Sequence, residues 1–131
     1  MPWFTLQEEH ITPQQISECC LRLLEEAKSR FGRPLKRVLL LPPDLTRAHS
    51  GAGKITEILF NALPDAHVEV IPTLGQHIPH TPDENRRMFG TIPNERIFAH
   101  DWRNGCMHVG VIPASVVAEK AVLTKGFFQW P

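Results

Sequence analysis

Residues 36–71 decide the fold, and they read KRVLLLPPDLTRAHSGAGKITEILFNALPDAHVEVI. Lys36 to Leu41 is a short apolar run without alternation, which is typical of a strand buried in a parallel sheet. After a polar loop, Lys54 to Leu63 repeats its apolar residues at helical spacing, and His67 to Ile71 has the length and composition of a second strand. Strand, loop, helix and strand in this order are typical of a doubly wound α/β fold.

The segments on either side extend this pattern. Pro13 to Phe31 has apolar residues at helical spacing, with Thr12 placed to cap its start and Gly32 to end it. Thr81 precedes a second helix that begins with a proline and should end near Gly90. Four later elements are predicted, which are strands at Arg96–Ala99, His108–Ile112 and Ala121–Thr124 and a helix at Pro113–Lys120. We therefore expect one domain over residues 1–131, with a Rossmann-like α/β architecture, a mostly parallel sheet and flanking helices.

Composition limits the kinds of partner. The 131 residues carry 14 basic and 14 acidic side chains, so the formal charges cancel, and no strong field is available for nucleic acid or a membrane surface. The longest apolar run, Val38 to Leu41, ends at Pro42 and is too short to span a bilayer. The amino terminus has no signal-peptide pattern, and the three cysteines are expected to be free thiols. We expect a cytoplasmic protein with a small-molecule partner.

The loop that begins at Asp44 follows the first predicted strand, where open α/β sheets bind ligands. Its glycines would let backbone N–H groups approach an anion, and Arg47 would add charge-assisted hydrogen bonds. A phosphate loop of the nucleotide triphosphatase type is excluded, because Ala48 replaces its first glycine and Ile55 replaces the hydroxyl that binds magnesium. Two interpretations remain, a helix start capped by Ser50 or a phosphate or nucleotide site.

The loop after the second predicted strand contains two histidines, His77 and His80. A histidine can act as a general acid or base near neutral pH, whereas two histidines alone do not complete a zinc site. Acid–base catalysis, metal binding and a structural role all remain open. Because both loops leave parallel strands at their carboxyl ends, we expect Asp44 and His77 at the same sheet edge. The polar cluster HDWR, residues 100–103, is interpreted as a turn in which Asp101 bonds the backbone.

Three motifs stand in order between residues 37 and 120, and they read LLPPDLTRAHSGAG, TLGQHIPHTPDE and FG-x-IP-x-x-RI-x-x-HDW. Together they resemble the N-terminal domain of the lactate racemase family. The resemblance implies the N-terminal portion of a larger two-domain isomerase, a racemase or epimerase of 2-hydroxy acids. It also implies a nickel-pincer nucleotide cofactor, pyridinium-3,5-bisthiocarboxylic acid mononucleotide nickel. By motif match, the cofactor-binding stretch falls on Asp44, Leu45, Thr46 and Arg47, and a catalytic histidine falls on His77.

The sequence departs from the family pattern in two respects. Leu45 stands where lactate racemases have an arginine that binds the substrate carboxylate. The expected substrate is therefore a small 2-hydroxy acid or sugar acid other than lactate. The family's second base, cofactor-linked lysine and nickel-ligand histidine have no match before Pro131. We therefore expect the isolated chain to be inactive and to need a C-terminal portion of the enzyme as partner. The alternative is a non-catalytic module that binds a nucleotide or another anion.

Overall fold

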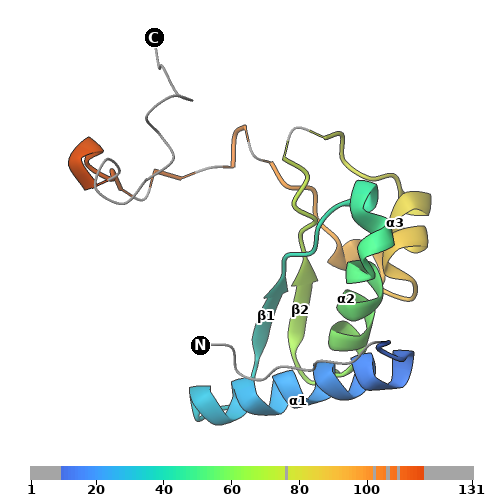
Figure 1. Ribbon diagram of the computed structural model, residues 1–131. Coiled ribbons are helices and arrows are strands. Elements are labelled where there is room, and N and C mark those ends of the chain that lie inside the picture. Colours follow the sequence, from blue (N-terminus) through green and yellow to red (C-terminus); the bar gives the residue numbers. More distant parts are fainter. Residues whose placement is uncertain (1–9, 76, 102, 106, 109, 117–131) are drawn as a thin grey trace.

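The computed structural model describes residues 10–116, apart from residues 76, 102, 106 and 109. The named elements within this part are α1 (Pro13–Phe31), β1 (Arg37–Leu40), a 3₁₀ turn (Leu45–Ser50), α2 (Ala52–Asn61), β2 (His67–Val70), α3 (Pro82–Phe89) and a second 3₁₀ turn (Asn94–Arg96). In Figure 1, α2 and α3 lie on one side of the two strands, and α1 crosses near the ends at which the strands begin. The predicted α/β class is thus confirmed for the described residues.

The two strands form a small parallel sheet. Arg37 pairs with His67 and the register continues to Leu40 opposite Val70. A further parallel bridge, between Pro43 and Thr73, keeps the two segments that follow β1 and β2 side by side beyond the strand ends. Parallel neighbours need a crossover connection, and α2 supplies it, so β1, α2 and β2 form the predicted βαβ unit. Both following loops therefore leave the sheet at the same edge.

The strand predicted at Arg96–Ala99 is wrong, because that region is reduced to a single parallel bridge between Ile97 and Val70. The backbone N–H of Arg96 donates to Pro93 O at 3.0 Å, and that of Ile97 donates to Asn94 O at 3.0 Å. These bonds close the second 3₁₀ turn and remove both N–H groups from any strand ladder. The described sheet is therefore smaller than the sequence suggested.

The predictions beyond residue 100 have mixed outcomes. The described residues among 108–112 are not a strand, and Val111 and Ile112 remain 78% and 72% exposed, since no described segment packs against them. The helix predicted from Pro113 begins at Ala114 and is helical to residue 116, and the remainder of that prediction lies outside the described residues. The strand predicted at Ala121–Thr124 also lies outside them.

Local capping explains why the helix bounds were predictable. Thr12 and Gln15 form a reciprocal capping box at the start of α1, and Gly32 ends that helix in the left-handed conformation with φ of 60°. Thr81 and Glu84 form the same box at the start of α3. The prediction for α2 was two residues late at its start, because Gly51, with φ of 75°, closes the preceding 3₁₀ turn and lets α2 begin at once.

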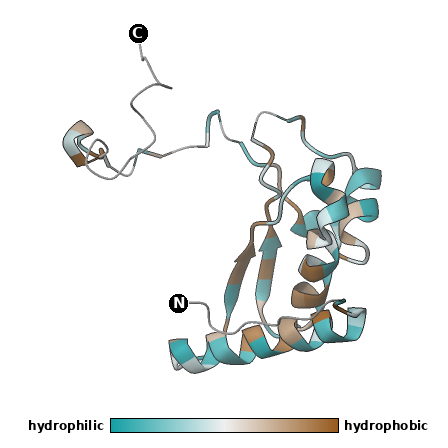
Figure 2. Ribbon diagram, viewed as in Figure 1, coloured by the Kyte–Doolittle hydropathy of each residue, from teal (hydrophilic) through white to brown (hydrophobic). Residues whose placement is uncertain are grey.

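Two clusters of buried side chains hold the helices against the sheet. Val70 and Phe89 are fully buried and pack with Met88 and Ile92 between β2 and α3. A second cluster, built on Leu24, Leu63 and Val68, joins α1 to the strands. In Figure 2 hydrophobic colouring covers most of β1 and parts of β2 and α2, whereas α3 is mostly hydrophilic. No helix within the described residues is long and apolar enough to cross a membrane.

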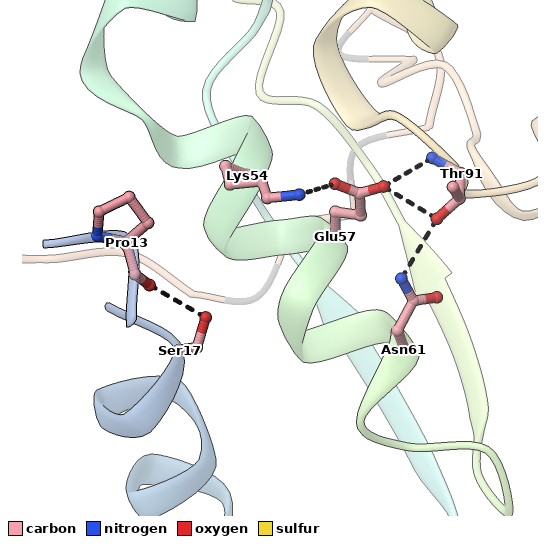
Figure 3. A network of polar contacts seen from close by, with 6 residues as sticks. All are labelled: Pro13, Ser17, Lys54, Glu57, Asn61 and Thr91. Atoms are coloured by element: carbon pink, nitrogen blue, oxygen red, sulfur yellow. Dashed lines mark hydrogen bonds and ion pairs between the residues drawn. The ribbon is translucent and has the colours of Figure 1, made fainter. Parts of the chain in front are cut away.

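A polar clamp centred on Glu57 ties α2 to the chain after α3 (Figure 3). Its Oε1 accepts hydrogen bonds from the backbone N–H and the hydroxyl of Thr91, both at 2.9 Å, and its Oε2 accepts from Lys54 Nζ at 2.8 Å. Gly90 suits this position because its φ of 59° lies in the left-handed region, and because a Cβ would lie 2.3 Å from Glu57 Oε1 and force the carboxylate to shift. The hydrogen bond from Lys54 and those from Thr91 hold the pKa of the Glu57 carboxyl below its usual range.

Replacing Glu57 by alanine should lower the free energy of unfolding by about 2 kcal/mol at neutral pH, because hydrogen bonds to a mostly buried carboxylate are lost. Since the folded pKa is depressed, this contribution is complete above the ordinary carboxyl pKa of about 4.3 and is lost as pH falls through the lower folded value. Urea unfolding between pH 7 and pH 3 should therefore show the two proteins converging in acid. Glu25→Ala, which breaks an exposed pair with Lys28, is the matched control and should cost less than about 0.5 kcal/mol.

Candidate functional site

The first part of the candidate site is the turn that follows β1. Asp44 caps the 3₁₀ turn and is only 4% exposed. Its Oδ1 accepts hydrogen bonds from the backbone N–H of Thr46 at 3.2 Å and from the Thr46 hydroxyl at 2.6 Å. An aspartate is favoured at such a position because its short side chain satisfies backbone donors that the turn leaves unpaired. The Asp44 carboxylate is thereby fixed at the sheet edge.

The second part is His77, from the loop that follows β2. Its Nδ1 contacts Oδ2 of Asp44, so the structure confirms that Asp44 and His77 meet at one sheet edge. Burial alone would raise the pKa of Asp44, but the hydrogen bonds from Thr46 and His77 outweigh burial and hold that pKa below its usual range. The charged carboxylate accepts from Nδ1, which leaves Nε2 as the proton-accepting nitrogen of a neutral His77 ring. The side chain of His77 is 56% exposed, so Nε2 is available for acid–base chemistry.

His80 differs from His77 in that both of its ring nitrogens have protein partners. The backbone N–H of Leu45 donates to Nε2 at 3.0 Å, and Nδ1 lies 3.1 Å from Oδ1 of the buried Asn85. The sequence left both histidines open to catalytic and structural roles, and spacing alone carries no signal that separates them. The structure makes His77 the candidate base and His80 a residue that holds the first loop.

The residues predicted to bind a cofactor lie in different surroundings. The half-buried Leu45 side chain packs against the buried cluster of Val70 and Phe89. Thr46 and Arg47 are exposed, and Arg47 has non-helical backbone angles, φ −107° and ψ 21°, inside the 3₁₀ turn. Asp44, Thr46 and Arg47 therefore share one turn, whereas the position at which the resemblance implied a substrate arginine is directed into the core.

The start of α2 partly decides between the two interpretations of its glycine-rich loop. Ser50 Oγ accepts from the backbone N–H of Ala52 at 3.2 Å, although Gly51 is the residue at the cap position. Gly53 touches α3, because a Cβ there would lie 2.0 Å from the backbone oxygen of Met88. Lys54 is paired with Glu57 on its own helix. Gly53 thus has a packing role and Lys54 an ion pair, and Arg47 remains a cationic candidate for an anion at this edge.

A third segment lies beside His77. A hollow of about 550 Å³ is lined by residues 77–79 and by residues 99–101, 103 and 104. Asp101 bonds the backbone as predicted, since its Oδ1 accepts from the N–H of Asn104 at 3.0 Å. The Nδ1 atom of His100 is buried and has no hydrogen-bond partner among the described residues. This turn could not be joined to His77 from the sequence, because their proximity depends on the Ile97–Val70 bridge.

Metal binding at the two histidines, one of the roles left open, gains no support from the geometry. Within the described part of the chain, no group of three or more histidine, cysteine, aspartate or glutamate side chains is placed to hold a metal ion. Leu45 and Asn85 already engage both ring nitrogens of His80, so that ring has no nitrogen left for a metal ion shared with His77. The arrangement favours proton transfer at His77 and anion binding at the neighbouring turn.

The chain was also compared with known proteins. The family model described as the lactate racemase N-terminal domain matches residues 7–120, which include every residue of the site above. No curated protein and no solved structure matches the chain. The matched span covers most of the 131 residues and begins upstream of the motifs that carried the resemblance. The chain therefore belongs to the lactate racemase N-terminal domain family.

Proposed function

We propose that this chain is the N-terminal, base-bearing part of a racemase or epimerase of 2-hydroxy acids that depends on a nickel-pincer nucleotide. One observation carries the proposal: His77 is oriented by a buried carboxylate beside the Asp44–Arg47 turn, at the carboxyl edge of the parallel sheet. Membership of a family that forms part of lactate racemase, an isomerase, supports the reaction class. We propose further that the whole enzyme has two domains and is cytoplasmic. Additional strands from the rest of that enzyme would extend the small parallel sheet into a Rossmann-like one.

The residues present fit the nucleotide end of such a cofactor. Thr46 and Arg47 are exposed on one turn, and Gly51 leaves open space beside the start of α2. The Thr46 hydroxyl already donates to Asp44, whereas the Arg47 guanidinium and the backbone N–H groups at the start of α2 suit a phosphate group. They do not supply nickel ligands within the described residues, so the metal end must be held by other parts of the enzyme. When bound, the cofactor supplies the hydride acceptor for the Cα hydrogen of the substrate.

The protein side of the chemistry rests on His77. Its Nε2 can take the hydroxyl proton of the substrate, and the Asp44 carboxylate stabilises the resulting imidazolium through Nδ1. The adjoining hollow, which includes Arg103, is the proposed place for a small hydroxy acid or sugar acid. Racemisation needs a base on each face of the substrate, and His77 can serve one face only. The isolated chain is therefore proposed to be inactive.

The purified chain should be loaded with the nickel-pincer nucleotide and tested for loss of optical activity with several 2-hydroxy acids, alone and mixed with the C-terminal portion of a lactate racemase-family enzyme. We expect no turnover by the chain alone and turnover by the mixture. Nucleotide binding without turnover in any mixture would favour the non-catalytic anion-binding module. If neither the chain alone nor the mixture binds the nucleotide, the proposal is contradicted.

A further inference from the structure

His80 lies at the centre of a hydrogen-bonded line that connects the first loop with α3. The Leu45 N–H donates to His80 Nε2 at 3.0 Å, and His80 Nδ1 lies 3.1 Å from Asn85 Oδ1. Asn85 Nδ2 in turn donates to Asn94 Oδ1 at 3.1 Å. The line therefore joins residues that are far apart in sequence, from the 3₁₀ turn after β1 to the 3₁₀ turn after α3.

The donor and acceptor roles along this line can be assigned from one fixed point. A backbone N–H can only donate, so Nε2 of His80 must be the acceptor and carries no proton. A neutral imidazole then carries its proton on Nδ1, which donates to Asn85 Oδ1. The Asn85 amide nitrogen, turned the other way, is left to donate to Asn94. Each group donates in the same direction, and the ring has one tautomer that satisfies all of them.

The line is anchored in the core. Asn85 is 8% exposed, and the His80 ring stacks on fully buried Phe89, with ring centroids 6.1 Å apart and planes at 30°. Asn85 and Phe89 lie on successive turns of α3, so the helix holds the ring both by its edge and by its face. Leu45 is then held at two points, by its N–H through His80 and by its side chain in the same core.

We propose that His80 is a positioning residue, which sets the place of the Asp44–Arg47 turn by accepting the Leu45 N–H as the neutral, Nδ1-protonated tautomer. Leu45 lies between the capping carboxylate of Asp44 and the exposed residues Thr46 and Arg47, so releasing the Leu45 N–H would let the residues on both sides of it move. The ligand of that turn rests on the proposed function, whereas the positioning role does not. The two histidines of this loop thus have different roles. His77 is the proposed base, and His80 positions the Asp44–Arg47 turn.

The test begins with the wild-type chain and needs no ligand. Nitrogen-15 NMR of the His80 ring at mildly alkaline pH should show a protonated Nδ1 and an unprotonated Nε2. Hydrogen exchange at the Leu45 amide should be slow. An Nε2-protonated ring would overturn the proposal, and this measurement does not depend on whether any variant folds.

Two variants separate hydrogen bonding from packing. His80→Phe keeps an aromatic ring against Phe89 but removes the acceptor, and Leu45 amide exchange should rise about tenfold. His80→Gln offers an oxygen in place of Nε2 and should restore much of the protection. His49→Gln, at an exposed histidine of the same 3₁₀ turn, should leave the Leu45 amide unchanged. Equal exchange in His80→Phe and wild type would refute the positioning role.

Measuring the affinity of these variants for the nickel-pincer nucleotide tests whether the position of the turn matters for the proposed function. The affinity should fall about tenfold in His80→Phe and recover in His80→Gln, a rescue that loss of packing alone would not give. If the wild-type chain does not bind the nucleotide, the proposed function is contradicted, while the tautomer and the Leu45 amide still decide the role of His80. If the nucleotide binds equally to all variants while the Leu45 amide responds as expected, the turn does not hold the nucleotide and the proposed function fails. If the Leu45 amide is also unchanged in all variants, the positioning role of His80 fails.

Discussion

Replacing His77 by asparagine should lower hydroxy-acid racemisation by the complemented enzyme about 100- to 10,000-fold, the usual contribution of a positioned general base. Asparagine keeps a short N–H donor for Asp44 but has no nitrogen that can accept a proton at neutral pH. Because the His77 side chain is more than half exposed, the free energy of unfolding should change by less than about 0.5 kcal/mol. The kinetic loss should therefore appear without a loss of folded protein.

His49→Asn provides the control for this experiment, since His49 is an exposed histidine on the neighbouring turn. Polarimetry and single-turnover proton exchange would follow both variants from each enantiomer. We expect the His77 variant to remove the hydroxyl proton much more slowly from one enantiomer than from the other, since one base serves one face of the substrate. A change smaller than tenfold from both enantiomers would assign His77 a structural role and transfer the proposed base to another residue.

The parts of the fold that depend on local chemistry could be predicted from the sequence. The bounds of α1 match the prediction because each end is determined by neighbouring residues, Thr12 and Pro13 at the start and Gly32 at the end. The strand predicted at residues 96–99 failed for a different reason. Its apolar residues were recognised, but whether Ile97 extends a ladder or makes one bridge depends on the 3₁₀ turn and on Val70, which lies far away in sequence.

The candidate site shows the same division between local and tertiary information. The βαβ order was enough to predict that Asp44 and His77 would meet, because parallel strands present their carboxyl ends at one edge. It was not enough to separate His77 from His80, since their partners come from the first loop and from α3. The inward direction of the Leu45 side chain likewise follows from the packing of Phe89 and could not be read from the motif.

Replacing Gly53 by alanine should lower the free energy of unfolding by about 3 kcal/mol, the upper part of the range for overpacked sites. The added Cβ would lie 2.0 Å from the backbone oxygen of Met88 and 3.0 Å from its carbonyl carbon. A flexible side chain could move aside, but this neighbour is the backbone of α3, so the two helices must separate. The higher helix propensity of alanine, worth about 0.5–1 kcal/mol, opposes the loss and does not outweigh it.

Urea unfolding of Gly53→Ala beside Gly110→Ala distinguishes the two roles that the glycine-rich loop could have. Gly110 has open space around its Cβ position, so its variant should unfold within about 0.5 kcal/mol of wild type. If Gly53 served close approach of a phosphate rather than of α3, its variant would keep wild-type stability and lose only anion binding. A large loss of stability instead assigns Gly53 to the α2–α3 contact. Any anion site at this edge must then rely on the Arg47 guanidinium and on backbone N–H groups at the start of α2, because both donors of Thr46 are bound to Asp44.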